Sequence, residues 1–191
     1  MPRRRDPFDP RAILAALERH YVDYVMIGGL ARVLHGTDEI TDGVDICPSF
    51  KAGNLDRLGA ALSELGAYRP DGEQPVISEE RLGTDRIVLV TTSAGVINIV
   101  GSPAGSPNGF VDLRRSATKE HLGHGLRPLI ASTGDLARTA AALGRDEDLA
   151  RLPELRRIME LEVDREQTLA PPAASKPAVT GRPGRGRRVT R

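Results

Sequence analysis

Hydrophobic residues recur at helical spacing in the N-terminal part of the chain. In "FDPRAILAALERHY", Asp9 is a suitable N-cap and Pro10 suits the first helical position, so a helix is predicted over about residues 10–21. In "NLDRLGAALSELG", Asn54 is the predicted N-cap of a second helix. Its apolar face is formed by Leu55, Leu58, Leu62 and Leu65. Both helices therefore have one side to bury against a core.

Two more helices are predicted near the C-terminus. The segment "TGDLARTAAALG" begins a helix at Thr133 or Asp135, and Gly144 ends it. The segment "DEDLARLPELRRIMELEVDRE" predicts a charged helix. Pro153 divides it, because proline lacks the N–H that a helix interior needs.

Short apolar runs bounded by glycine or proline predict strands. "YVMI" ends at Gly28-Gly29, and "GVDICP" ends at Pro48. "RIVLVTT" and "VINIV" are separated by Ser93-Ala94-Gly95 and predict a hairpin; "LRPLIAS" adds another strand. "LARVLHG" and "FVDLRRSA" predict short helices. Together these elements predict an α/β (α+β) domain, with a small mixed sheet flanked by helices and a helical C-terminal part over about residues 133–166.

Charge and composition divide the chain further. Residues 8–166 are expected to form the domain, after a flexible segment over residues 1–7. Residues 167–191 contain six basic and no acidic residues, so the remainder carries about −5 within a net charge of +1. This last segment is rich in proline, glycine and arginine and poor in large apolar residues, so it is expected to be a disordered basic tail.

The sequence also limits the compartment. No run reaches the roughly 18 apolar residues of a membrane span, and the N-terminal "MPRRRDPFDP" lacks the apolar stretch of a secretory signal. Cys47, the single cysteine, excludes an internal disulfide and is expected to be a buried apolar residue. A cytoplasmic protein without membrane contact is therefore expected.

The segment from Gly28 to Asp45 has the outline of a phosphate-and-metal site. Gly28 and Gly29 follow a strand and open a helix, so the backbone can approach a phosphate and the helix N-terminus can bind it. Two carboxylates at positions i and i+2 of the next strand would share one face and could hold Mg²⁺. In "GVDI", however, Gly43 stands at the first of these two positions and Asp45 at the second.

Three segments in order resemble a known family. "IGG" followed after 13 residues by "GVDI" is similar to the signature of the nucleotidyltransferase superfamily. The strings "YVMIGGLARVLHG…ITDGVDICPS", "TTSAGVINIVGSPAGSPNGFVDL" and "DLARTAAALGRDEDLARLPELRRI" resemble the AbiEii-type and Men-type toxins of bacterial toxin–antitoxin systems, over about residues 22–160. The resemblance implies a nucleotidyltransferase-like fold, NTP and Mg²⁺ as cofactors, an RNA acceptor such as tRNA, and an antitoxin-like partner. The residues that match the family are Gly28, Gly29, His35, Gly36, Thr41 and Asp45.

The same resemblance identifies four departures. Gly43 stands where the family has its first metal-binding aspartate, and Asn98 stands where a third carboxylate is common. Ala140 replaces a lysine that contacts the nucleotide, and Glu39 stands where an arginine is common. Asp45 alone would remain as a metal ligand, which favours a degenerate metal site and impaired transfer.

Three functional interpretations follow. In the first, the protein is an active toxin nucleotidyltransferase in which Gly28, Gly29 and Thr41 contact the nucleotide, and a strand shift brings Asp42 beside Asp45. In the second, it is a pseudoenzyme that binds a nucleotide, RNA or a protein partner. In the third, it is an accessory module that binds nucleic acid through residues 176–191.

Overall fold

The computed structural model describes residues 8–51, 53–85 and 87–169. The predicted flexible segment over residues 1–7 and residues 170–191 of the tail predicted over 167–191 lie outside the described residues, whereas residues 167–169 belong to a helix. None of the described helices has the length and hydropathy of a membrane span.

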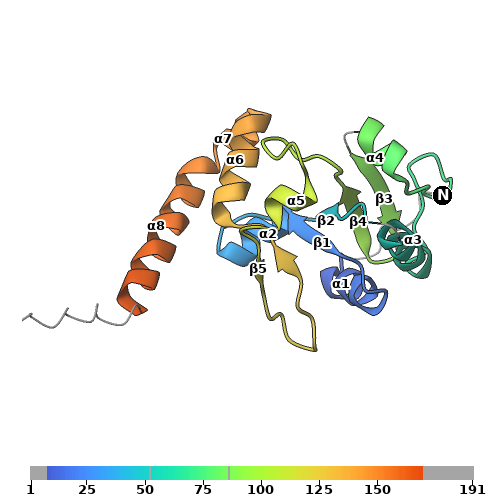
Figure 1. Cartoon of the computed structure of the whole chain (residues 1–191), viewed down its shortest axis with the longest axis horizontal. Coiled ribbons are helices and arrows are strands. Elements are labelled where there is room, and N and C mark those ends of the chain that lie inside the picture. Colours follow the sequence, from blue (N-terminus) through green and yellow to red (C-terminus); the bar gives the residue numbers. More distant parts are fainter. Residues whose placement is uncertain (1–7, 52, 86, 170–191) are drawn as a thin grey trace, which may run out of the picture.

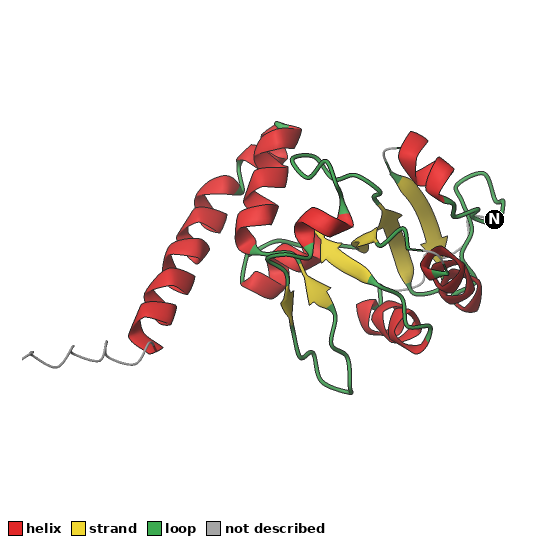
Figure 2. Cartoon of the chain, viewed as in Figure 1, coloured by secondary structure: helices red, strands yellow, loops and turns green. Residues whose placement is uncertain are grey.

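One six-stranded mixed sheet forms the centre of the molecule (Figure 2), which confirms the predicted fold class. The strands are β1 (Tyr24–Ile27), β2 (Gly43–Pro48), β3 (Val88–Thr92), β4 (Gly95–Ile99), β5 (Thr118–Lys119) and β6 (Leu129–Ile130). Their order across the sheet is β3-β4-β2-β1-β6-β5. The pairs β2–β4 and β1–β6 are parallel, and the other neighbours are antiparallel.

Eight helices accompany the sheet in the part of the chain that the structure describes. They are α1 (Pro10–Arg19), α2 (Gly28–His35), α3 (Asn54–Glu64), α4 (Glu79–Thr84), α5 (Phe110–Leu113), α6 (Thr133–Leu143), α7 (Asp146–Leu149) and α8 (Leu152–Leu169). Figure 1 shows α1 and α3 side by side next to the sheet, while α8 lies beyond α6 and extends away from the strands. The C-terminal helices therefore form an arm on one side of the sheet.

The core has the composition that the sequence predicted. Ile13 and Leu17 of α1 pack with Leu58 and Leu62 of α3 in the same buried cluster as the apolar strand residues. All four residues of β1 are buried, because this strand lies in the interior of the sheet and its neighbours cover both edges. β1 and β2 are thus held rigidly, and the loops at their ends can position polar groups.

The helix ends show how local chemistry sets the boundaries. Asp9 caps α1 by accepting a hydrogen bond of 3.1 Å from the N–H of Ala12, as predicted. The prediction for Asn54 was wrong: Gly53 takes the N-cap position and Asn54 is the first helical residue. Its buried amide instead bonds to the backbone of Asp23 and Ser49, at 2.7–2.9 Å, which ties α3 to the start of β1.

The remaining boundaries partly agree with the predictions. The predicted charged helix is interrupted between α7 and α8, just before Pro153, which confirms the predicted division. α1 ends at Arg19 rather than at residue 21, because Tyr21 adopts a positive φ of 52°. The short elements α4 and β5 were not predicted, and α8 continues through Leu169.

Candidate functional site

A cavity of about 540 Å³ opens where β1 ends and α2 begins, and we call it the Asp45 cavity. Six residues singled out in the sequence line it: Gly28, Gly29, Glu39, Thr41, Asp45 and Ala140. They come from the α2 N-terminus, the loop before β2, β2 itself and α6. The topology therefore gathers segments that are more than 90 residues apart around one space of the size of a ligand pocket.

The turn at Gly28 requires glycine for two reasons. Its φ is +71°, a left-handed conformation that other residues rarely adopt. A Cβ at this position would also lie 2.0 Å from an oxygen of the Asp45 carboxylate. The glycine thus lets the backbone meet the acid directly, and the N–H of Gly29 donates a hydrogen bond to Asp45.

Asp45 is partly buried at the floor of the cavity. Burial raises its pKa, and hydrogen bonds from Asn98 and Gly29 oppose that rise, as do the positive charges of Arg32 and Arg145. The amide nitrogen of Asn98 donates to Asp45 Oδ1 at 2.8 Å. Asp45 and Asn98 face each other across the parallel pair β2–β4, so the sheet register fixes this contact.

The Asp45–Asn98 pair does not fit a two-metal site. A pair of carboxylates at this position would face each other with four acceptor oxygens and would need a cation between them. In this protein the side-chain N–H of Asn98 donates a hydrogen bond to the Asp45 carboxylate instead. No group of three or more histidine, cysteine, aspartate or glutamate side chains in the described ranges is placed to hold a metal ion.

Gly43 lies outside the cavity lining, buried in the β2–β4 ladder opposite Val96. A Cβ at Gly43 would lie 3.2 Å from the Val96 carbonyl oxygen, so β4 would have to move by a few tenths of an ångström to admit a side chain. Asp42 is exposed and does not line the cavity. The ladder from Gly43 to Ile46 is continuous and has no bulge that would turn Asp42 toward Asp45.

The cavity is also lined by three arginines that the sequence analysis did not single out: Arg32, Arg145 and Arg151. Arg32 follows Gly28 by one helical turn, and this spacing is the signal that could have identified it. It forms two hydrogen bonds with Glu39, of 2.8 and 2.9 Å, and these bonds lower the pKa of Glu39. The acid at position 39 thus neutralises the cation nearest to the glycine turn.

The other two arginines come from the segment between α6 and α8. Arg145 pairs with Asp148 at 2.6 Å, and Arg151 donates to the carbonyl oxygen of Asp38 at 3.2 Å. Ala140 is only 2% exposed, so its methyl group closes the wall of α6 without reaching into the cavity. Ala140 therefore supplies no positive charge to the cavity, whose lining arginines are Arg32, Arg145 and Arg151.

His35, which matches the family motif, and Cys47, the single cysteine, do not line the cavity. His35 donates from Nε2 to the carbonyl oxygen of Ala131 at 2.8 Å, and its Nδ1 lies 3.5 Å from Glu162 of α8. It joins α2 to the C-terminal helices. Cys47 is fully buried, and burial raises its pKa to about 12, so its thiol is unreactive.

Comparisons with known proteins gave distant structural matches. No protein-family model and no curated protein sequence matches the chain. The solution structure of the antibiotic-resistance factor ANT(2″)-Ia matches with 14% identity and a TM-score of 0.46, over 83% of this chain and 95% of that one. Its crystal structure with adenylyl-2″-tobramycin matches with 14% identity and a TM-score of 0.47, over 84% and 97%.

A third match is a protein from Thermotoga maritima assigned as a nucleotidyltransferase. It is 16% identical, has a TM-score of 0.46, and covers 85% of this chain and 96% of that chain. At these values the similarity is too distant to assign an activity to the chain.

Proposed function

We propose that this chain is a nucleotidyltransferase-fold protein that binds a nucleoside triphosphate in the Asp45 cavity and is impaired in nucleotidyl transfer. The observation that carries the proposal is the hydrogen bond of 2.8 Å from Asn98 to Asp45. This bond gives the Asp45 carboxylate a partner within the protein, whereas in an active site a metal ion would bind it.

The cavity retains groups that suit a phosphate chain. Gly28 and Gly29, at the N-terminus of α2, line the cavity beside Asp45, so this helix end faces the same space. Arg145 and Arg151 also line the cavity, so a bound phosphate chain would have a helix N-terminus and two guanidinium groups around it. These features support binding without requiring a metal ion.

The motif resemblance supports a lineage for this proposal. We infer descent from the AbiEii/Men-type toxins, whose activity would be NTP- and Mg²⁺-dependent transfer to tRNA in the cytoplasm. An antitoxin-like protein partner belongs to the same inference. Asp45 is the one carboxylate among Gly43, Asp45 and Asn98, so the inferred loss falls on the metal ligands and spares the glycine turn.

Binding of ATP to Asp45→Asn tests the proposed site directly. In the absence of metal, Asp45 places a negative charge beside the triphosphate, so its removal should strengthen ATP binding in EDTA by about threefold or more. Asp42→Asn removes the same charge from an exposed neighbour outside the cavity and should leave the affinity unchanged. Isothermal titration calorimetry in EDTA and in Mg²⁺ measures both. Binding that appears only with Mg²⁺ and is lost in Asp45→Asn would contradict the proposal.

A transfer assay tests the proposed impairment. Labelled NTPs, Mg²⁺ or Mn²⁺ and total tRNA are incubated with the natural protein and with a Gly43→Asp, Asn98→Asp, Ala140→Lys variant. The natural protein should leave the RNA unlabelled. Circular dichroism must show that the variant is folded, because Gly43→Asp forces β4 away. Labelling by the natural protein would disprove the impairment.

A further inference from the structure

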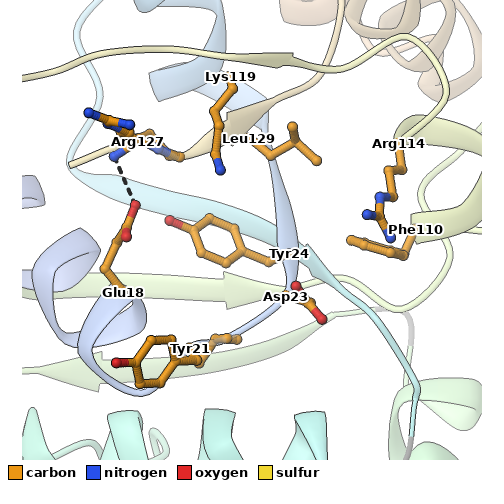
Figure 3. A pocket seen from close by; sticks show the side chains of 11 residues that line it. Glu18, Tyr21, Asp23, Tyr24, Phe110, Arg114, Lys119, Arg127 and Leu129 are labelled. Carbon is orange, nitrogen blue, oxygen red and sulfur yellow. Dashed lines mark hydrogen bonds between the residues drawn. The ribbon is translucent and has the colours of Figure 1, made fainter. Parts of the chain in front are cut away.

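A second cavity, of about 400 Å³, lies at the opposite end of β1, and we call it the Tyr24 cavity (Figure 3). Tyr24 is the first residue of β1, whereas the Asp45 cavity begins where the strand ends at Ile27. The two cavities share no lining residue. The Tyr24 cavity is enclosed by the end of α1, the start of β1, α5 and the β5–β6 hairpin.

The hydroxyl of Tyr24 lacks a partner. The residue is 6% exposed, and no group in the described part of the chain forms a hydrogen bond with its phenolic oxygen. A buried hydroxyl without a partner is unfavourable unless a water or a ligand completes it. Burial, together with the charge of Glu18, raises the pKa of Tyr24, so the phenol stays protonated at neutral pH and can donate.

Cations line the cavity on both sides of Tyr24. Figure 3 shows Lys119 extending from β5 toward Tyr24 and Arg114 lying above the Phe110 ring on the other side of the cavity, with its guanidinium carbon 5.6 Å from the ring centroid. Within the described ranges, neither side chain is ion-paired with a carboxylate. In the Asp45 cavity, by contrast, Arg32 and Arg145 are both paired. Arg127 adds a third positive charge at the edge, although its side chain points away from Tyr24.

The two acids of the cavity are held by other groups. Glu18 accepts a hydrogen bond of 2.8 Å from the backbone N–H of Arg127, which fixes its carboxylate at one side. Asp23 is more than half exposed and faces Arg57 at 3.9 Å. The Lys119 side chain, which extends toward Tyr24, and the free hydroxyl therefore define a place for an anion, and Arg114 adds positive charge on the other side of the cavity.

An aromatic surface lies at the rim. Tyr21 is 81% exposed, although its backbone is held in a left-handed conformation with a φ of 52°. Its carbonyl oxygen accepts a hydrogen bond of 2.9 Å from Arg57, and its N–H donates to Glu18 at 3.0 Å. The backbone of Tyr21 is thus held in place, and its exposed ring at the cavity rim provides a surface on which a nucleic-acid base can stack.

We propose that the Tyr24 cavity binds a nucleotide, with its phosphate between Lys119 and the Tyr24 hydroxyl and its base on Tyr21. The shared chemistry is a phosphate ester carrying a planar ring, either as a free mononucleotide or as one unit of a single strand. The proposal is independent of the Asp45 cavity, because the two sites have no residue in common.

The test uses the full chain with three probes: adenosine 5′-monophosphate, a short 5′-phosphorylated oligoadenylate, and adenosine, which lacks the phosphate. Titration calorimetry should detect both phosphate probes and not adenosine if the source is a free nucleotide. It should detect only the oligoadenylate if the source is a strand. Lys119→Gln should weaken binding of the detected probe by about tenfold.

Two further variants separate the cavity from general attraction to positive charge. Arg11→Gln removes one charge from an exposed position on α1 outside the cavity, and it should change the affinity by less than about twofold. Equal losses in Lys119→Gln and Arg11→Gln would overturn the proposal, because they would assign binding to net charge. Failure of both phosphate probes to bind at millimolar concentration would overturn it as well.

Tyr24→Phe gives a readout that a purely structural tyrosine would not give. Because the hydroxyl has no internal partner, its removal should raise the melting temperature of the free protein and weaken phosphate binding several-fold. A lower melting temperature with unchanged binding would show that the hydroxyl serves the fold, and would overturn the role assigned to it here.

Discussion

At the scale of single residues, the decisive feature is the amide at position 98. Asn98 and Asp45 occupy paired positions of adjacent parallel strands, so their side chains meet whatever their chemistry. Asn98 donates a hydrogen bond of 2.8 Å to Asp45. A second acid at position 98 would instead repel the Asp45 carboxylate, and only a proton or a cation would relieve that repulsion. One amide in place of an acid thus removes the need for a metal ion.

Asn98→Asp should make the stability of the protein depend on metal ions. Two facing carboxylates should destabilise the fold by about 1–3 kcal/mol in EDTA at pH 8, since the hydrogen bond is replaced by like charges. Addition of Mg²⁺ or Mn²⁺ should restore part of this loss, as measured by thermal unfolding. Asn98→Ala, which removes the bond without adding charge, should not respond to metal. An equal metal response in the natural protein would argue against this account.

Asp45 should also give the protein a measurable pH dependence. Its folded pKa is raised above the ordinary value of 3.8, so its contribution to stability is complete below that value and is lost as the pH rises through the folded pKa. The free energy of unfolding of Asp45→Asn, minus that of the natural protein, should therefore increase as the pH rises from about 4 toward neutrality. Asp42→Asn, which removes an exposed acid outside the cavity, is the matched control. A difference that falls with pH would mean that hydrogen bonding outweighs burial at this site.

At the scale of elements, polar side chains in the core fix how helices meet strands. Asn54 shows this clearly, because it is fully buried and bonds to two backbone segments outside its own helix. Sequence patterns identified α3 and its apolar face but assigned Asn54 to a cap. The true partners lie up to 31 residues away, and no local pattern records them.

Asn54→Ala should destabilise the protein by about 2–4 kcal/mol, because the change leaves the N–H and carbonyl of Asp23 and the carbonyl of Ser49 without this partner. Denaturant unfolding followed by circular dichroism measures the effect. Asp56→Asn, on the exposed side of the same first turn, should cost less than about 0.5 kcal/mol. Similar losses for both variants would show that helix propensity, and not the amide network, is responsible.

The strands and helices of the domain were largely predictable, and so were the glycine turn and Asp45. Alternating and helical patterns are local, and "YVMIGG" contains both the strand and the turn that ends it. The pairing of Arg32 with Glu39 and the isolation of the Tyr24 hydroxyl were not predictable. They depend on loop geometry and on the β5–β6 hairpin, whose two-residue strands give no periodic signal.

At the scale of the whole molecule, the C-terminal helices belong to the site as well as to the fold. α8 packs on α6, and Leu155 at the start of α8 is fully buried. Glu154 accepts a hydrogen bond of 3.0 Å from the N–H of Asp38, in the loop that leads to β2. Arg151, just before α8, lines the Asp45 cavity. A change in the packing of α8 should therefore reach the cavity.

Leu155→Ala should lower the free energy of unfolding by about 2–5 kcal/mol and weaken ATP binding, because the loosened α8 no longer holds Arg151. Leu161→Ala, at a position that is 58% exposed on the same helix, should change neither quantity appreciably. Chemical denaturation and ATP titration measure the two effects. A stability loss with unchanged ATP affinity would show that the cavity is independent of α8.

The close contact at Gly43 has a consequence for the evolutionary history of such a protein. An aspartate introduced there meets the Val96 carbonyl oxygen before it can serve as a ligand, and an aspartate introduced at position 98 meets Asp45. Each single step toward a metal site thus passes through a less stable intermediate that gains no activity. Acquisition of a metal site by successive point mutations is therefore opposed at both positions, and selection for metal-dependent transfer should introduce these acids only together with changes that widen the spacing of β2 and β4.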